Sequence, residues 1–256
     1  MIRDLTIVLP AYNEALRIGA TIDKVLAYAQ GRFDRLELIV VDDGSTDGTG
    51  DLVERTYGSR VRVLRRPNGG KGAAVRTGVQ AATRPWILFA DADLAIPIRE
   101  IEKLAAHVES APIVIGSKRA PGNDIVYPKF RLFLGAVGGL LISLLVVPGF
   151  HDTQCGFKLY RTDVAQELFA VNRLDGFGFD FEVLYLARRY GHRVIEVPVR
   201  VEHQLGSTVR ATSYLRVLRE AFSVFWNKLT GAYPPRGEVL GRRAPGGIQG
   251  PPAGSL

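Results

Sequence analysis

Two carboxylates stand one residue apart where an apolar run ends, in the stretch ILFADADLAIP from residue 87 to residue 97. Carboxylates without a countercharge repel each other and resist burial, so we expect a positive ligand between Asp91 and Asp93. Side chains two residues apart in an extended chain point the same way, which predicts that both acids face one ligand. Two hard oxygen donors suit Mg²⁺ or Mn²⁺, which often completes its shell with water and substrate phosphates. A solvated turn with spare acids is the alternative.

Two earlier apolar runs also end in polar clusters. In LPAYNE, Pro10 is predicted to stop a strand, Tyr12 offers a ring for stacking on a base, and Glu14 either caps a helix or accepts from a ribose. In VVDDGSTDGT, Asp42 lies where an acid can accept from a base or a ribose, while Asp47 or Ser45 is a candidate helix cap. These clusters therefore favour a nucleoside ligand, with local capping as the simpler interpretation.

A fourth cluster, RRPNGGKGAA, suggests a phosphate ligand. Gly69, Gly70 and Gly72 let the backbone approach closely, Lys71 supplies charge, and a helix is expected to begin there. The spacing differs from that of a P-loop, and Val75 stands where a dinucleotide-binding fingerprint needs its third glycine. This argues against a dehydrogenase.

The elements that must position these clusters alternate along the first half of the chain. Short β-branched runs and helical patterns predict βαβ units on a mostly parallel sheet with helices on both faces. Ligands of such sheets collect at the carboxyl ends of the strands, where the polar clusters stand. The predicted strands are 5–9, 36–41, 61–64, 86–90 and 113–115, and the predicted helices are 15–29, 47–57, 72–82 and 98–109.

The composition favours certain classes of ligand but does not identify a single one. The 256 residues carry a net charge of +7, which favours anionic ligands such as nucleotides, phosphorylated substrates or an acidic membrane surface. No aromatic-interleaved basic patch appears, so nucleic acid is not expected. The single cysteine, Cys155, excludes an internal disulfide and suits a reducing compartment. No secretory signal is expected at the N-terminus.

The second half predicts one continuous domain over residues 1–233, followed by a disordered Pro/Gly/Arg tail over 234–256. An uncharged segment over 132–150 is near the lower length limit for a bilayer span, so a buried or interfacial helix at 132–147 is favoured. A basic amphipathic helix is expected over 211–229, either at a membrane surface or packed with a solvated basic side.

The motifs PAYNE, VDDGSTDGT, GGKGAAVRTG and DAD, in this order, resemble those of family 2 glycosyltransferases with the GT-A fold. The later segments DTQCGFKLYR and GFGFDFEVLYLARRYG resemble the branch that contains dolichyl-phosphate β-glucosyltransferases and other polyprenyl-phosphate glycosyltransferases. The likeness covers roughly residues 5–233. It implies a nucleotide-sugar donor, a divalent cation and a lipid-phosphate acceptor.

The resemblance also implies roles for single residues. Asp91 and Asp93 would hold the metal and the donor diphosphate, although Ala95 stands where some relatives carry a third oxygen ligand. Ser207 belongs to a late loop, HQLGST, that closes near the donor phosphates in relatives. The remaining donor-site residues would be Pro10, Tyr12, Glu14 and Asp42 for the nucleoside, Lys71 near the base or diphosphate, and Arg119 for phosphate or sugar.

Two further acids are candidate catalytic residues. Asp152 opens DTQCGFK, which polyprenyl-phosphate relatives place in the active site, and Asp180 matches the place where enzymes acting on hydroxyl acceptors keep a base. A phosphate acceptor is already anionic, its second pKa being about 6, and scarcely needs a base. Asp152 is therefore favoured, with Asp180 in a positioning role. The alternative for both is a buried acid paired with Lys158 or an arginine, and Cys155 is expected to pack in the core.

The sequence therefore predicts an inverting, metal-dependent glycosyltransferase on the cytoplasmic face of a membrane. The first donor expected is UDP-glucose or a UDP-hexosamine, with GDP-mannose possible, and the acceptor is a polyprenyl phosphate. A soluble or polysaccharide hydroxyl acceptor is the nearest alternative. A non-catalytic nucleotide-sugar-binding module is a more distant one.

Overall fold

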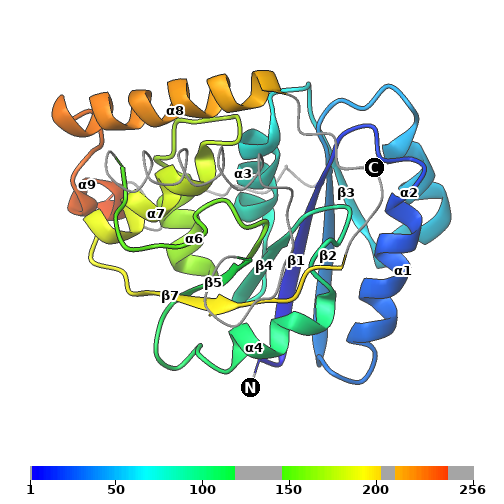
Figure 1. The fold of residues 1–256 in the computed structure, drawn as a ribbon. Coiled ribbons are helices and arrows are strands. Elements are labelled where there is room, and N and C mark those ends of the chain that lie inside the picture. The colour runs from blue at the N-terminus through cyan, green and yellow to red at the C-terminus, as the bar shows by residue number, and fades with distance from the viewer. Residues whose placement is uncertain (1, 119–145, 203–210, 242–256) are drawn as a thin grey trace, which may run out of the picture.

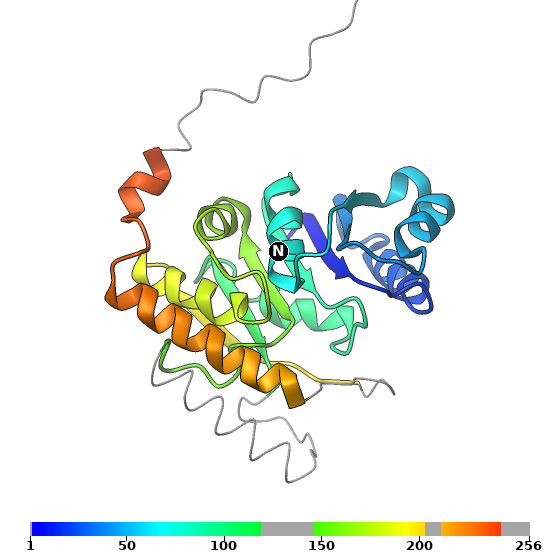
Figure 2. The same ribbon diagram turned by 90° about the horizontal axis from the view of Figure 1, so that it is seen from above.

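The computed structural model describes residues 2–118, 146–202 and 211–241 (Figure 1). The predicted helix at 132–147 falls almost entirely outside these ranges, as do Arg119, Ser207 and the HQLGST loop. In the described part, seven strands form one sheet with helices packed on both of its faces (Figures 1 and 2). The predicted α/β fold class is confirmed.

The sheet is parallel except at one strand. Strand β6 (Phe157–Arg161) runs antiparallel between β4 (Trp86–Ala90) and β5 (Ile113–Ser117). All other neighbouring strands are parallel. The full order is β3 (Arg62–Arg65), β2 (Arg35–Asp42), β1 (Asp4–Ala11), β4, β6, β5 and β7 (Val194–Pro198).

Alternating side chains of the strands divide the core into two halves. In β4, Ile87 and Phe89 join the half formed with α3 (Lys71–Ala81), α6 (Thr162–Phe169) and α7 (Phe179–Arg189). Leu88 and Ala90 join the other half, formed with α1 (Ile18–Ala29), α2 (Thr49–Tyr57) and α4 (Ile101–Ala105). This period of two is what a sheet buried on both faces requires. Short 3₁₀ turns lie at Gly58–Arg60 and Ile98–Glu100.

Two expected element boundaries were wrong, and one strand was missed. Pro10 does not stop the first strand, because β1 continues to Ala11 and Pro10 pairs in register with Val41 of β2. The helix expected over 98–109 divides into the 3₁₀ turn and α4, which ends at Ala105. Strand β6 was missed because its short sequence, FKLYR, carries a lysine in the middle and does not have the apolar character of a buried strand.

The predicted start of the disordered tail was also wrong. Beyond Pro234 the chain forms α9 (Arg236–Gly241), which follows the long helix α8 (Ala211–Leu229). Val239 is buried, and the Arg236 guanidinium lies 2.7 Å from the Glu167 carboxylate of α6. The domain therefore extends at least to Gly241, and residues 242–256 lie outside the described ranges.

Gly78 of α3 marks the tightest approach of this helix to the sheet and gives a test of the packing. A Cβ at this position would lie 2.3 Å from Cγ1 of Val8 in β1. We expect Gly78→Ala to lower the free energy of unfolding by about 1–3 kcal/mol, the usual cost of overpacking a core. Gly19→Ala in α1 is the matched control, because a Cβ there meets Tyr57 Oη at an ordinary 3.6 Å. Urea denaturation showing equal stability for both variants would contradict this packing.

Candidate active site

The loops after β1 and β2 are joined by hydrogen bonds. The Asn13 amide donates to Ser45 Oγ, and the Thr46 amide donates to Asn13 Oδ1, both at 2.9 Å. Asp47 accepts from the Thr49 amide at 3.0 Å, but the N-cap residue of α2 is Gly48 and no side chain caps the helix, so the capping prediction was wrong. Asn13 has φ of 55°, a left-handed conformation that asparagine tolerates better than most residues. The two loops therefore form one wall at the carboxyl end of the sheet.

Tyr12 and Glu14 lie on this wall. The Tyr12 side chain is half exposed, which leaves its ring accessible to a ligand. Glu14 pairs with Arg17, and this hydrogen bond, with a smaller contribution from the charge of Asp93, raises the pKa of Arg17. Because β1 and β4 are neighbouring parallel strands, the wall and the Asp91–Asp93 segment lie at the same end of the sheet.

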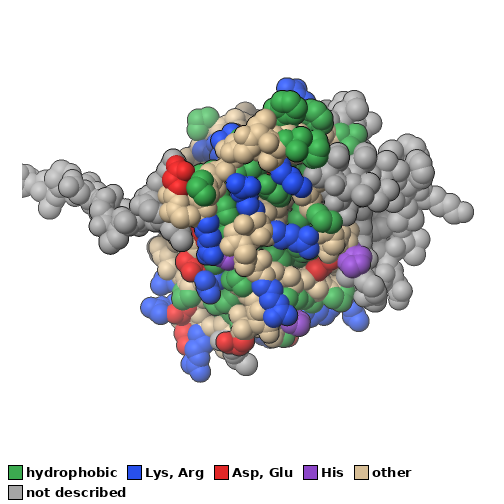
Figure 3. Space-filling view, turned by 90° about the vertical axis from the view of Figure 1, so that its left-hand side faces the viewer, with side chains coloured by type: hydrophobic (Ala, Val, Ile, Leu, Met, Phe, Trp, Pro, Cys, Tyr) green, Lys and Arg blue, Asp and Glu red, His purple; other side chains and the backbone are tan. Residues whose placement is uncertain are grey.

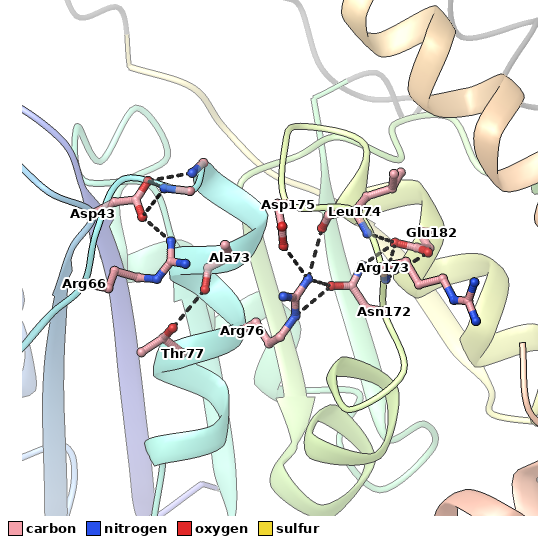
Figure 4. Close-up of polar contacts among 12 residues, drawn as sticks. Asp43, Arg66, Ala73, Arg76, Thr77, Asn172, Arg173, Leu174, Asp175 and Glu182 are labelled. Atoms are coloured by element: carbon pink, nitrogen blue, oxygen red, sulfur yellow. Dashed lines mark hydrogen bonds and ion pairs between the residues drawn. The ribbon is translucent and has the colours of Figure 1, made fainter.

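Asp42 and Asp43 are both buried at the end of β2 but make different contacts. Asp42 Oδ1 accepts from the Ser45 amide at 2.9 Å, which holds its own loop. Asp43 pairs with Arg66 and accepts from the amides of Gly69 and Gly70, the latter at 2.8 Å (Figure 4). Asp43 is thus a structural anchor for the glycine segment, a role that sequence reasoning missed although the residue adjoins Asp42.

Backbone amides in the glycine segment and directly after it donate to protein groups. The amides of Gly72 and Ala73 donate to the Asp175 carbonyl at 2.8 and 3.2 Å. A Cβ at Gly70 would lie 2.6 Å from the same oxygen, and one at Gly72 would lie 2.7 Å from the Leu174 carbonyl. The glycines therefore make room for a neighbouring protein loop, which Arg76 also holds through an ion pair with Asp175 (Figure 4).

Lys71, the first residue of α3, reaches the carboxylate pair. Its Nζ lies 2.6 Å from Asp91 Oδ1 and 5.3 Å from the centre of the Phe89 ring. Burial lowers the pKa of Lys71, but the charges of Asp91 and Asp180 outweigh burial and raise it overall. Lys71 is therefore a permanent positive charge at neutral pH, fixed beside Asp91.

The Asp91–Asp93 segment is a turn rather than the extended chain that was expected. The Leu94 amide donates to the Asp91 carbonyl at 3.0 Å, and Leu94 has φ of 44°. Ala92 is buried, and its carbonyl accepts from Thr21 Oγ1 at 2.6 Å. Both carboxylates remain partly exposed on the open side of this turn.

The chemistry of these two side chains fits a divalent cation that takes its other ligands from water and substrate. Both present hard carboxylate oxygens at one strand end. Asp93 Oδ1 accepts from the Ala95 amide at 3.0 Å, so Ala95 orients a ligand through its backbone. Within the described ranges, no group of three or more His, Cys, Asp or Glu side chains is arranged to hold a metal. Asp91 and Asp93 would therefore need substrate oxygens to complete the shell.

Gly156, the residue before β6, determines where Asp91 can lie. The Asp91 amide donates to the Gly156 carbonyl at 3.1 Å, and a Cβ at Gly156 would lie only 1.9 Å from Asp91 Oδ2. The carboxylate thus rests on bare backbone. Gly156 is part of the DTQCGFK motif, but the sequence alone does not show that it contacts Asp91.

Asp180 is buried and forms an ion pair with Lys158 of β6. This is the arrangement expected if Asp180 is a buried, paired acid and not a catalytic residue. The Asp180 side chain is 3% exposed and that of Lys158 is fully buried. Lys158 Nζ also donates to the Cys155 carbonyl at 2.7 Å. Burial raises the pKa of Asp180, although the charges of Lys158 and Lys71 oppose this shift.

Asp152 contacts Lys118, the residue that follows β5. Its carboxylate is buried, accepts from the Lys118 amide at 3.1 Å and lies 3.9 Å from Lys118 Nζ. Burial, aided by the charge of Asp152, raises the pKa of Cys155 to about 12. The cysteine is therefore a protonated core residue at neutral pH, as expected.

The Lys158–Asp180 pair gives a stability test. Lys158→Met leaves an uncompensated buried carboxylate, so we expect the free energy of unfolding to fall by about 3–5 kcal/mol. Adding Asp180→Asn removes that charge and should restore much of the loss. Urea denaturation of both variants at neutral pH measures the difference, and a double variant no more stable than the single one would contradict the pairing.

Comparison with known proteins identifies the family of the chain. The model of the family described as "Glycosyl transferase family 2" matches residues 6–169. The dolichyl-phosphate β-glucosyltransferase of Drosophila melanogaster is 35% identical over 250 residues, which cover 90% of this chain and 77% of that protein. The human protein of the same name is 33% identical and covers 90% and 78%.

Solved structures share the fold. Mannosyl-3-phosphoglycerate synthase from Rubrobacter xylanophilus superposes with a TM-score of 0.63 at 18% identity, covering 88% of this chain and 74% of that one. Glucosyl-3-phosphoglycerate synthase from Mycobacterium tuberculosis, crystallised with Mn²⁺, UDP and its product, gives 0.62 at 22% identity, covering 89% and 79%. Such identities establish the GT-A fold alone. From the family match and its curated relatives, the chain belongs to glycosyltransferase family 2.

Proposed function

We propose that the enzyme transfers glucose from UDP-glucose to a polyprenyl phosphate of the dolichyl type, with inversion at the anomeric carbon. The observation that carries the proposal is the placement of Asp91 between Lys71 and Gly156, with Asp93 beside it. This arrangement puts two accessible carboxylates and one fixed ammonium at the strand end where ligands of such sheets bind. The names of relatives that match nine-tenths of the chain support the sugar and the acceptor.

On the donor side, Asp91 and Asp93 would hold Mg²⁺ or Mn²⁺. Such an ion, when bound, neutralises charge on a departing nucleoside diphosphate. Lys71 supplies a second positive charge there, and its pairing with Asp91 keeps it oriented before the donor arrives. Tyr12, with its exposed ring, would stack on the base, and Asp42 and Glu14 would contact the nucleoside.

On the acceptor side, the buried state of Asp180 suits a phosphate nucleophile. A phosphate oxygen is already anionic near neutral pH, whereas a sugar hydroxyl needs a base that can reach it. Asp180 is 3% exposed and bound to Lys158, so we assign it to positioning Lys71 and Lys158. Asp152, under the Lys118 backbone, would orient the segment that meets the acceptor. One backside displacement would then convert an α-linked donor to a β-linked product.

The lipid acceptor implies action at a membrane surface, and we infer peripheral association with a cytoplasmic face. Among the helices of the described ranges, none has the length and apolar character needed to cross a bilayer.

A transfer assay tests the donor, the acceptor and the metal together. Purified protein with UDP-glucose, Mg²⁺ or Mn²⁺ and dolichyl phosphate in detergent should give a glucolipid, and chelation by EDTA should abolish it. Asp93→Asn should lower kcat/KM at least about 100-fold, as removing one electrostatic group from an active site commonly does. Asp34→Asn, an exposed acid at the opposite end of the sheet, should have no effect.

Outcomes of the same assay separate the alternatives. No product from any UDP- or GDP-sugar would overturn the proposal. Product formed on a hydroxyl acceptor but not on dolichyl phosphate, and lost in Asp180→Asn, would establish the hydroxyl-transferring alternative instead.

Gly156→Ala tests the geometry of Asp91 without removing a charged group. The added methyl group would occupy the position of the Asp91 carboxylate and displace it. A displacement of about 1 Å at a reacting centre can cost about 100-fold in rate, and we expect a loss of that order in kcat/KM. Circular dichroism should show a native fold, and Gly19→Ala should retain full activity. Unchanged activity of Gly156→Ala would show that Asp91 is not held as described.

A further inference from the structure

One side of α8 exposes large apolar side chains. Their spacing of four, four and three residues places them on one side of the helix. Ala221 and Val224, on the opposite side, are buried in the core formed with α7. The exposed side, which we call the α8 face, consists of Leu218, Phe222, Trp226 and Leu229, which are 38%, 58%, 57% and 63% exposed.

Figure 3 shows hydrophobic side chains gathered at the top of the molecule, where α8 lies, with lysine and arginine side chains below them. Exposed apolar residues scattered singly are ordinary, but a contiguous aromatic patch on a protein surface usually marks an interaction site. Phe222 and Trp226 also line a shallow surface hollow together with Arg219 and Ser223.

The charges beside the α8 face indicate the partner. Arg216, Arg219 and Lys228 are basic, and the one acid in the sequence of the helix is Glu220. Glu220 is turned toward the protein, where its carboxylate accepts from the Gly178 amide at 2.7 Å. The accessible charge along α8 is therefore positive, in a chain with a net charge of +7.

We propose that the α8 face lies in the surface of an anionic lipid bilayer. An amphipathic helix with Trp, Phe and Leu on one side and Arg or Lys beside them is the arrangement that inserts at the boundary of headgroups and acyl chains. Tryptophan is favoured at that depth, and basic residues near the surface are attracted by anionic lipids.

A loop beside the candidate active site contacts this helix. Besides the Glu220–Gly178 hydrogen bond, a Cβ at Gly176 would lie 2.0 Å from Glu220 Oε1, so the loop packs directly on that side chain. The same loop supplies the Asp175 carbonyl to the start of α3 beside Lys71. In Figure 1, α8 lies across the end of the sheet toward which β1 runs from the N-terminus. If the acceptor is a lipid phosphate, which rests on the proposed function, docking through α8 would bring this end of the sheet to the bilayer.

The chain offers its own reporter for the test. It has two tryptophans, so Trp86→Phe leaves Trp226 as the sole indole. We expect vesicles of phosphatidylcholine and phosphatidylglycerol to shift Trp226 emission to shorter wavelength, and brominated acyl chains to quench it. Phosphatidylcholine alone should act more weakly, and added salt should reduce binding to the anionic vesicles.

Variants identify the surface. Phe222→Glu combined with Trp226→Glu, in the full chain, should weaken co-sedimentation with the anionic vesicles at least about tenfold, since each buried aromatic side chain contributes about that factor or more. Leu16→Glu changes another fully exposed apolar residue and is the matched control, which should bind vesicles as the unmodified protein does.

Equal vesicle binding by the double variant, or an unquenched Trp226, would overturn the inference. Sedimentation velocity without lipid tests the alternative that a second copy of the chain binds the α8 face. If the double variant dissociates a dimer and vesicles do not bind the unmodified protein, the α8 face is an interface between copies and the inference fails. Transfer to a short-chain, water-soluble polyprenyl phosphate is measured separately. If the unmodified protein does not catalyse this transfer, the proposed function is contradicted. The vesicle-binding result tests the α8 face independently of transfer.

Discussion

Four charges of alternating sign meet at the carboxyl end of the sheet, and four separate elements depend on them for their positions. Asp91 follows β4, Lys71 begins α3, Asp180 lies in α7 and Lys158 lies in β6. Lys71 touches Asp91 and feels the charge of Asp180, which in turn holds Lys158. Removing one member would leave its neighbour unpaired, and an unpaired buried charge costs several kcal/mol. Asp91, whose side chain is 36% exposed, is thus the outermost member of a network in which only the Asp180–Lys158 pair is closed to solvent.

Backbone contacts supply the rigidity that the charges need. The amides at the start of α3 are bound by Asp43 from one side and by the Asp175 carbonyl from the other. On α7, Glu182 is buried and accepts from the Leu174 amide at 2.7 Å (Figure 4), which fixes the base of the same loop. It also accepts from Tyr233 Oη at 2.7 Å. Burial raises the pKa of Glu182, against the pull of these hydrogen bonds. Lys71 therefore projects from a segment whose backbone amides are hydrogen-bonded to neighbouring loops.

Much of this could be predicted from the sequence, because strand-forming runs and strand-end acids are local signals. The parallel strands through β5, their helices and the positions of Asp42, Asp91 and Asp93 at strand ends follow from apolar patterning. Other features depend on contacts distant in sequence. Lys158 looks unsuited to a core strand until Asp180 is placed against it, and Gly70 and Gly72 resemble a phosphate loop until residues 174–176 occupy the space. The turn at Leu94 is set by Thr21, which holds Ala92 inward, and no pattern around residue 91 contains that information.

The reversed direction of β6 has a consequence for how the chain folds as it is made. Strand β5 touches β4 nowhere in the sheet, since β6 separates them, and β7 is joined to the rest only through β5. Both strands that pair with β5 follow it in the sequence, so its pairing can begin only after residues up to Arg161 have been synthesised. The parallel portion from β3 to β4 can form without it, because its pairings are complete within residues 4–90. Pairing of β6 with β4 and β5 then joins the two portions and, in the same event, brings Gly156 against Asp91, so that the Asp91 carboxylate reaches its position only when the sheet is complete.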